Sequence, residues 1–153
     1  MEHHIVQSRS KPEGLAVALV VEQFNRSGPE PGPFAVALAR WFLDQGHAVT
    51  IVCGRHAPRD LPAEARLRLL GHYDKPYLWR LLGFARRARG FLDHGGFDVR
   101  LSLTTLVAGD VMILRGGTYA AEAGGSGPGR AVLRWLERRV MRSPIIQSAA
   151  VET

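Results

Sequence analysis

The stretch LAVALVVEQFNRSGPEPGPFAVALARWFLDQGHAVTIVC, residues 15–53, decides the fold of this 153-residue chain. It begins with an unbroken apolar run, Leu15–Val21, whose length and lack of alternation predict a strand buried on both faces of a parallel sheet. The turn-rich loop Glu22–Gly32 follows, and Phe34–Leu43 then carries apolar residues at helical spacing. Gly46 ends that helix, and His47–Cys53 predicts a second strand. Strand, helix and strand in this order predict a right-handed parallel crossover.

The rest of the chain continues the alternation of strands and helices. We expect further strands at residues 67–70, 98–103 and 110–114, helices at 77–94 and 130–142, and the beginning of a last strand within 144–151. Such alternation predicts the α/β class, here a Rossmann-like, doubly wound parallel sheet. Residues 1–13 are expected to form a flexible leader, and residues 14–153 a single domain.

Composition narrows the class without deciding the function. The chain is 46% hydrophobic and 22% charged, which is typical of a globular protein, and no apolar run approaches the roughly 20 residues that span a bilayer. Its single cysteine, Cys53, is expected to be a buried structural thiol. The net charge of +6, almost all from arginine, suits nucleic acid, anionic lipid or a phosphorylated sugar, and equally a solvated surface on which arginine replaces lysine.

Ligands of an open parallel sheet bind at the carboxyl ends of its strands, which selects the loops Glu22–Gly32, Leu103–Asp110 and Arg115–Glu122. The first loop offers Ser27, Gly28 and Gly32 as substrate-binding residues, because its glycines permit close approach to a ligand and the following helix would point its amides into the cleft. The loop lacks the G-x-G-x-x-G fingerprint of dinucleotide-binding enzymes. An ordinary connection from strand to helix explains the segment equally well.

The third loop gathers polar groups behind a predicted strand. Gly116, Gly117, Thr118 and Tyr119 are candidate substrate-binding residues, since such groups at a strand's carboxyl end can orient a hydroxylated ligand. Asp110, before that strand, is the candidate catalytic residue, as a general acid or base or as an acceptor for a sugar hydroxyl. Capping of a turn is the alternative role for Asp110. No metal site is expected, because the histidines lack ligand spacing and there is one cysteine.

The last predicted helix is basic and amphipathic. A stripe of arginines repeats every fourth residue: Arg130, Arg134, Arg138 and Arg142. The opposite side is apolar, with Trp135 toward the boundary, and comprises Val132, Leu133, Leu136 and Val140. This composition is typical of a helix at a membrane surface. A helix packed on the sheet with a solvated arginine face fits the pattern as well.

Taken in order, these segments resemble the N-terminal domain of family 4 glycosyltransferases, whose GT-B fold consists of two facing Rossmann-like domains. The resemblance is carried by Leu15–Val21 with Arg26-Ser-Gly-Pro-Glu30, and by Phe34–Leu43 with Gln45-Gly-His-Ala-Val-Thr-Ile-Val52. The lipopolysaccharide core glucosyltransferase branch is the most similar, through Leu101-Ser-Leu103, Gly109-Asp-Val111 and Gly117-Thr-Tyr-Ala-Ala-Glu122. Only the combination is specific, and it covers roughly residues 14–142.

The resemblance implies a retaining transferase that moves a hexose from a nucleotide sugar, UDP- or ADP-linked, to a lipid-linked or oligosaccharide acceptor in cell-envelope polysaccharide biosynthesis. It implies no bound cofactor or metal, and a cytoplasmic protein at the inner face of the membrane. It places Ser27, Gly28 and Gly32 in the cleft between donor and acceptor, and Asp110 with Gly116–Tyr119 on the acceptor side. The prolines of Gly28-Pro-Glu-Pro-Gly-Pro33 depart from the family, because they remove amide donors from the phosphate-facing turn.

The family also has a C-terminal, donor-binding domain with paired glutamates, which does not occur within these 153 residues. We therefore expect a truncated, acceptor-side half that is catalytically incomplete alone and needs a donor-binding domain as partner. The alternative function is a non-catalytic Rossmann-like module that binds an anionic membrane surface or nucleic acid through its arginine-rich helix. We expect no nucleic-acid partner, because no aromatic-rich basic platform or reading helix accompanies the arginines.

Overall fold

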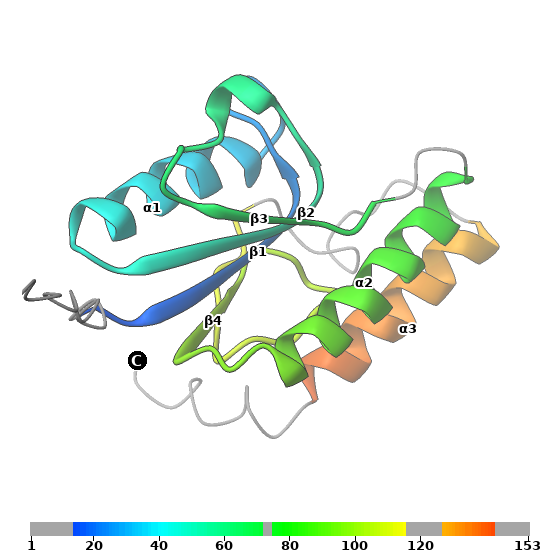
Figure 1. Cartoon of the computed structure of the whole chain (residues 1–153). Helices are drawn as coiled ribbons and strands as arrows, with labels where there is room; N and C mark the ends of the chain where they lie inside the picture. The colour runs from blue at the N-terminus through cyan, green and yellow to red at the C-terminus, as the bar shows by residue number, and fades with distance from the viewer. Residues whose placement is uncertain (1–13, 72–74, 116–126, 143–153) are drawn as a thin grey trace, which may run out of the picture.

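The structure, a computed structural model, describes residues 14–71, 75–115 and 127–142 (Figure 1). Five strands, three α-helices and a 3-10 turn occur in these residues, in the order β1 (Ala16–Phe24), α1 (Gly32–Asp44), β2 (Ala48–His56), η1 (Pro58–Asp60), β3 (Arg66–Leu69), α2 (Tyr77–His94), β4 (Val99–Ser102), β5 (Val111–Met112) and α3 (Pro128–Met141). None of these helices is long and apolar enough to cross a membrane.

The five strands form one sheet in the order β3-β2-β1-β4-β5, and every neighbouring pair is parallel. β1 lies at the centre, where Val17 pairs with Val49 of β2 on one side and Val99 of β4 on the other. The chain first builds outward through β2 and β3, then crosses to the far side of β1 for β4 and β5. This order confirms the predicted Rossmann-like, doubly wound sheet.

Helices cover both faces of the sheet. α1 packs on one face, while α2 and α3 lie side by side over the other (Figure 1). Alternate residues of β1 serve the two cores: Val17, Leu19 and Val21 contact the α1 side, and Ala18 and Val20 the α2 side. All five are at most 1% exposed, which is the burial that the unbroken apolar run predicts.

Several predicted boundaries are wrong by a few residues, and two of these shifts matter for the site. β1 does not end at Val21 but continues through Glu22 to Phe24, and β2 continues past Cys53 to His56. The added residues pair with each other, Gln23 with Arg55 and Phe24 with His56. The side chain of Phe24 is fully buried in the α1-side core, so extending the strand is favourable. The predicted loop at 22–32 therefore shortens to Asn25–Pro31.

The remaining shifts are smaller. α1 begins at Gly32 and α3 at Pro128, both earlier than expected, and β4 and β5 are shorter than expected. α2 has the predicted bounds, Tyr77–His94. The expected leader at 1–13 and the strand expected within 144–151 lie outside the described residues.

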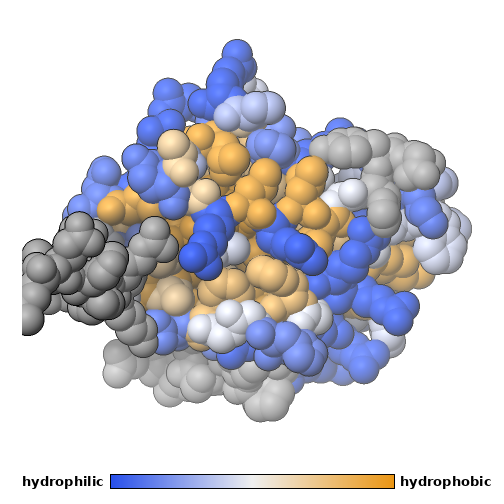
Figure 2. All heavy atoms as spheres, viewed as in Figure 1, coloured by the Kyte–Doolittle hydropathy of each residue, from blue (hydrophilic) through white to orange (hydrophobic). Residues whose placement is uncertain are grey.

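β3 is an edge strand on the face shown in Figures 1 and 2. Figure 2 shows apolar side chains gathered across the middle of this face, with hydrophilic side chains between them. Leu69 of β3 is 42% exposed, and Arg66 and Arg68 beside it are also exposed. Charged side chains on an edge strand disfavour pairing with a further strand. The two arginines therefore oppose such pairing, although Leu69 leaves an apolar side chain exposed on β3.

Candidate functional site

The first loop, Asn25–Pro31, lies at the carboxyl edge of the sheet and is held by its own polar groups. The side-chain oxygen of Asn25 accepts a hydrogen bond from the Ser27 amide at 2.9 Å. The buried carboxylate of Asp60, in η1, accepts one from the Arg26 amide at 2.9 Å. These bonds tie the loop to itself and to the connection after β2, which fixes Ser27 and Gly28 at the end of β1.

Gly32 begins α1 and packs directly against the end of β1. A Cβ at this position would lie 2.8 Å from the carbonyl oxygen of Asn25 and 2.9 Å from that of Gln23, so the helix can approach this closely only with glycine. The Gly32 amide already donates to the Pro29 carbonyl and the Ala35 amide to the Pro31 carbonyl, both at 2.9 Å. Since residue 33 is proline, the first turn of α1 offers few free donors to an anion.

The strand order changes direction at β1, which places the usual crevice of this fold between the carboxyl ends of β1 and β4. A hydrogen bond bridges this point: the Thr104 hydroxyl, just after β4, donates to a carboxylate oxygen of Glu22 at 3.1 Å. The loop behind it is organised by the fully buried Ser102, whose hydroxyl oxygen lies 2.9 Å from the Thr104 carbonyl oxygen and 2.7 Å from that of Val107. Glu22 is therefore held in place at the switch point.

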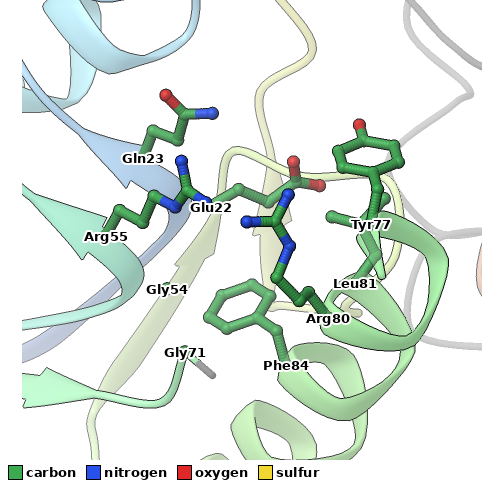
Figure 3. A pocket seen from close by; sticks show the side chains of 9 residues that line it. All are labelled: Glu22, Gln23, Gly54, Arg55, Gly71, Tyr77, Arg80, Leu81 and Phe84. Atoms are coloured by element: carbon green, nitrogen blue, oxygen red, sulfur yellow. The ribbon is translucent and has the colours of Figure 1, made fainter. Parts of the chain in front are cut away.

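A small open hollow of about 70 Å³ adjoins Glu22 on the side of β2, β3 and α2. Its lining comes from β1, β2 and α2 and from Gly71, which lies shortly after β3: Glu22, Gln23, Gly54, Arg55, Gly71, Tyr77, Arg80, Leu81 and Phe84. Figure 3 shows Arg55 from β2 and Arg80 from α2 reaching toward Glu22 from opposite sides, with the Tyr77 ring at the rim. Arg80 also lies over the Tyr77 ring, its guanidinium carbon 5.8 Å from the ring centroid.

Two glycines leave the floor of this hollow without side chains. A Cβ on Gly54 would lie 3.1 Å from the Glu22 carbonyl oxygen and 3.8 Å from the Phe84 ring. A Cβ on Gly71 would collide with the Gly54 carbonyl group, 2.9 Å from its carbon and closer to its oxygen. The ends of β2 and β3 thus meet through bare backbone, and the buried Phe84 ring closes the hollow from below.

Asp110, the predicted catalytic residue, lies outside the lining of this hollow. It precedes β5 and stands opposite Arg100, whose amide donates to its carboxylate at 2.8 Å and whose Nε lies 3.7 Å from the same oxygen. Arg100 is level with Ala18 of β1, four residues before Glu22, which is about 13 Å along a strand. The geometry gives Asp110 a structural role at the amino end of β5. Its general acid or base role stays a prediction.

The structure brings the beginning of the third loop next to the first. Arg115 lies over the ring of Phe34, near the start of α1, with its guanidinium carbon 4.6 Å from the ring centroid. The other candidates in this loop, Gly116, Gly117, Thr118 and Tyr119, lie outside the described residues, so their substrate-binding role stays a prediction. Ser27, Gly28 and Gly32 do share the carboxyl edge with the hollow, but they do not line it.

In α3, the prediction of one solvated arginine stripe opposite one apolar side is wrong in part. The buried face is centred on Leu133, Glu137 and Val140. A stripe repeating every fourth residue drifts by about 40° at each step around a helix, so Arg130 and Arg134 are half-buried while Arg138 and Arg142 are exposed.

Trp135, expected at the boundary of α3, instead lies on its solvent side and is 57% exposed. The guanidinium carbon of Arg139 is 5.5 Å from the Trp135 ring centroid. Val132, expected on the apolar side, is 39% exposed. The solvent face of α3 therefore mixes apolar and basic side chains, since Arg138, Arg139 and Arg142 are exposed beside them.

A reactive thiol and a cluster of metal ligands are the two further kinds of site that the side chains could form. Burial raises the pKa of the Cys53 thiol to about 12, so Cys53 stays protonated and fits the predicted structural thiol. Among the described residues, no three His, Cys, Asp or Glu side chains gather closely enough to hold a metal ion.

Sequence reasoning missed the residues that line the hollow. Glu22 was expected in the first loop and Arg55 beyond the end of the second strand. Instead, Glu22 lies two residues before the end of β1, and Arg55 lies one residue before the end of β2. Tyr77 and Arg80 were expected within the helix at 77–94, with no role in a site. The polar residues Glu22 and Gln23 directly after the apolar run, with the apolar Phe24 following, were a usable signal that the strand continues.

Comparisons with known proteins agree with the architecture. No protein-family model and no curated protein matches the sequence. Among solved structures, the chain is similar to WaaG, a glycosyltransferase involved in lipopolysaccharide biosynthesis, with a TM-score of 0.68 and 16% sequence identity. The match covers 80% of this chain and 34% of that one, so the chain spans about a third of the length of WaaG. At this identity the likeness shows the fold, the Rossmann-like sheet found in a GT-B glycosyltransferase.

Proposed function

We propose that this chain is the acceptor-binding half of a retaining, nucleotide-sugar-dependent glycosyltransferase of family 4. Joined to a donor-binding domain, it would help transfer a hexose from a UDP- or ADP-sugar to a lipid-linked or oligosaccharide acceptor. One observation carries the proposal: a parallel sheet in the order β3-β2-β1-β4-β5, similar to that of WaaG, has a hollow with charged side chains at the carboxyl ends of its strands.

The role proposed for the chain is positional. β1 and β4 hold Glu22 at the switch point through Thr104, and the first loop is fixed beside it, so an acceptor sugar bound here would keep one orientation. Holding an acceptor hydroxyl against the anomeric carbon removes much of the entropic barrier to transfer. Stabilisation of the departing nucleoside diphosphate is then the task of the donor-binding domain.

The test joins this chain to the donor-binding domain of a lipopolysaccharide core glycosyltransferase and measures nucleotide release. UDP- and ADP-hexoses are supplied with a lipid-linked sugar acceptor, and the donor domain alone gives the background of hydrolysis. We expect release of UDP or ADP that depends on both this chain and the acceptor. Release no faster than that of the donor domain alone, together with no acceptor binding by calorimetry, would contradict the proposal.

A second function, contact with an anionic membrane surface, is favoured by the solvent face of α3. The exposed Trp135 and Val132 could enter the headgroup region, while Arg138, Arg139 and Arg142 would each contribute about 1 kcal/mol at an anionic surface. Membrane contact would suit a glycosyltransferase that works at the inner face of the membrane. It is also the function of the alternative, a non-catalytic module that only binds the membrane surface.

Flotation with vesicles containing anionic lipid tests this contact. Trp135→Ala should lower the bound fraction severalfold, whereas Trp41→Ala, at a similarly exposed tryptophan on α1, should leave it unchanged. Equal losses in both variants, or equal binding to vesicles without anionic lipid, would rule the contact out. A duplex DNA shift at two salt concentrations completes the test, because tighter and steeply salt-dependent DNA binding would favour nucleic acid instead.

A further inference from the structure

Among the described residues that line the hollow beside Glu22, basic side chains outnumber acidic ones. The charged residues are two arginines, Arg55 and Arg80, and one glutamate, Glu22. The two guanidinium groups come from different elements and approach from opposite sides (Figure 3). Thr104 holds one oxygen of Glu22 from the β4 side. Two guanidiniums that reach into one hollow from different elements can donate to the several oxygens of a phosphate or carboxylate.

The start of α2 adds to this preference. Tyr77, Arg80, Leu81 and Phe84, from its first two turns, form one wall of the hollow. Pro76 occupies the N-cap position and no side chain caps the helix. The positive end of the helix dipole therefore lies beside the arginines, where it favours a negative ligand.

The size and floor of the hollow indicate how much of a ligand enters. Its volume of about 70 Å³ is well below that of a site that encloses a small molecule, so an anionic group enters and the rest of a sugar stays outside. Gly54 and Gly71 form a floor of bare backbone, and the buried Phe84 ring excludes water from below. The Tyr77 ring, 56% exposed at the rim, offers an apolar surface for the C–H face of a sugar outside.

We propose that the hollow binds the anionic group of a sugar, a phosphate or a carboxylate, with Arg80 and Arg55 as the binding residues and Tyr77 against the ring. The inference rests on the proposed function in one respect, because it names the chemical class of the acceptor. It assigns a subsite to residues distinct from Ser27, Gly28 and Gly32. The anionic group contacts the guanidiniums from the open side of the hollow, beside Glu22, and the sugar hydroxyls stay outside.

Isothermal titration calorimetry on the full chain tests the subsite with four probes: a hexose 6-phosphate, a hexuronate, inorganic phosphate and the uncharged hexose. We expect both anionic sugars to bind more tightly than the hexose and more tightly than inorganic phosphate. Whichever anionic sugar binds more tightly identifies phosphate or carboxylate as the natural group. Arg80→Gln should weaken that binding at least tenfold, and Arg55→Gln should weaken it severalfold.

Arg86→Gln is the matched control, since Arg86 is an exposed arginine on the same helix outside the hollow. It should change the dissociation constant less than twofold. Circular dichroism of each variant establishes that it is folded. The subsite is refuted if none of the anionic probes binds, if Arg80→Gln and Arg55→Gln both bind like the unchanged chain, or if Arg86→Gln loses as much affinity as they do.

The two proposals fail in different ways. If the joined enzyme transfers sugar but Arg80→Gln changes neither the dissociation constant nor KM for an anionic acceptor, the subsite is wrong and the transfer activity stands. If anionic sugars bind through Arg80 but the joined enzyme releases no nucleotide, the transfer activity is wrong and the subsite stands.

Discussion

Replacing Gly71 with alanine should destabilise the chain, because the floor of the hollow leaves no room for a side chain. The new Cβ would meet the Gly54 carbonyl group, 2.9 Å from its carbon and closer to its oxygen. The backbone around Gly71 is also held in place. The Leu70 amide donates to the Cys53 carbonyl at 2.8 Å, and Arg87 donates to the Leu70 carbonyl at 3.0 Å.

The expected cost follows from the two ways of relieving this contact. Keeping the hydrogen bonds forces an overpacked contact, which costs about 1–3 kcal/mol. Moving the strand end breaks them and leaves polar groups unsatisfied, at about 1–3 kcal/mol for each buried group. We therefore expect the free energy of unfolding to fall by about 2–3 kcal/mol. In urea, with a slope of about 1–3 kcal/mol/M, the midpoint should fall by roughly 1–2 M, as measured by far-UV circular dichroism.

Gly90→Ala is the matched control within α2. A Cβ there meets nothing within 4 Å, and alanine is favoured over glycine inside a helix by about 0.5–1 kcal/mol. The same substitution should thus raise stability at residue 90 and lower it at residue 71. An unchanged midpoint for Gly71→Ala beside a stabilised Gly90→Ala would refute the close contact between the ends of β2 and β3. Equal losses at both positions would show that the contact is not the cause.

Three other substitutions or conditions test separate parts of the structure. Burial raises the pKa of Cys53 from 9.0 to about 12, so alkylation at pH 8 should require opening of the folded chain, and rapid alkylation of the folded chain would contradict this. The stability due to this thiol is full below pH 9 and should be lost as the pH rises toward 12. Ser102→Ala removes the hydroxyl between the Thr104 and Val107 carbonyls and should cost about 1–3 kcal/mol in urea unfolding. Asp110→Asn should lower the free energy of unfolding by about 1 kcal/mol, because it weakens the contact with Arg100. The transfer rate of the joined enzyme should not change. A hundredfold fall in that rate would instead establish Asp110 as a general acid or base.

The fold could be predicted because its main signals are local. The run Leu15–Val21 is apolar at every position, which only a strand covered on both faces requires. The spacing of apolar residues from Tyr77 to His94 gave α2 its bounds. Boundaries were missed where a residue's place depends on a neighbouring strand: Glu22 and Gln23 are polar, and they continue β1 because β2 pairs alongside them and the Phe24 side chain is buried.

The candidate site was harder to predict because its residues are brought together by topology. Glu22 and Arg80 are far apart in the sequence, and only the parallel sheet and the crossover through α2 place them in one hollow. Asp110 shows how strand register adds what the sequence cannot give, while its catalytic role stays a prediction. Its neighbours in sequence suggested a catalytic position, but the register of β4 and β5 sets it opposite Arg100, at the amino end of β5.

The small volume of the hollow has a consequence for affinity. Sites that enclose a small molecule measure about 300–1,000 Å³, whereas this hollow of about 70 Å³ would enclose only the anionic group and leave the sugar ring against Tyr77 and solvent. A few charge-assisted bonds on an open surface correspond to a dissociation constant of about a millimolar, or roughly 4 kcal/mol. A second wall over the ring would tighten binding tenfold for every 1.4 kcal/mol it contributes. If the chain is half of a cleft, anionic sugars should therefore bind weakly to it alone and more tightly to the joined enzyme, while the loss caused by Arg80→Gln should be the same factor in both.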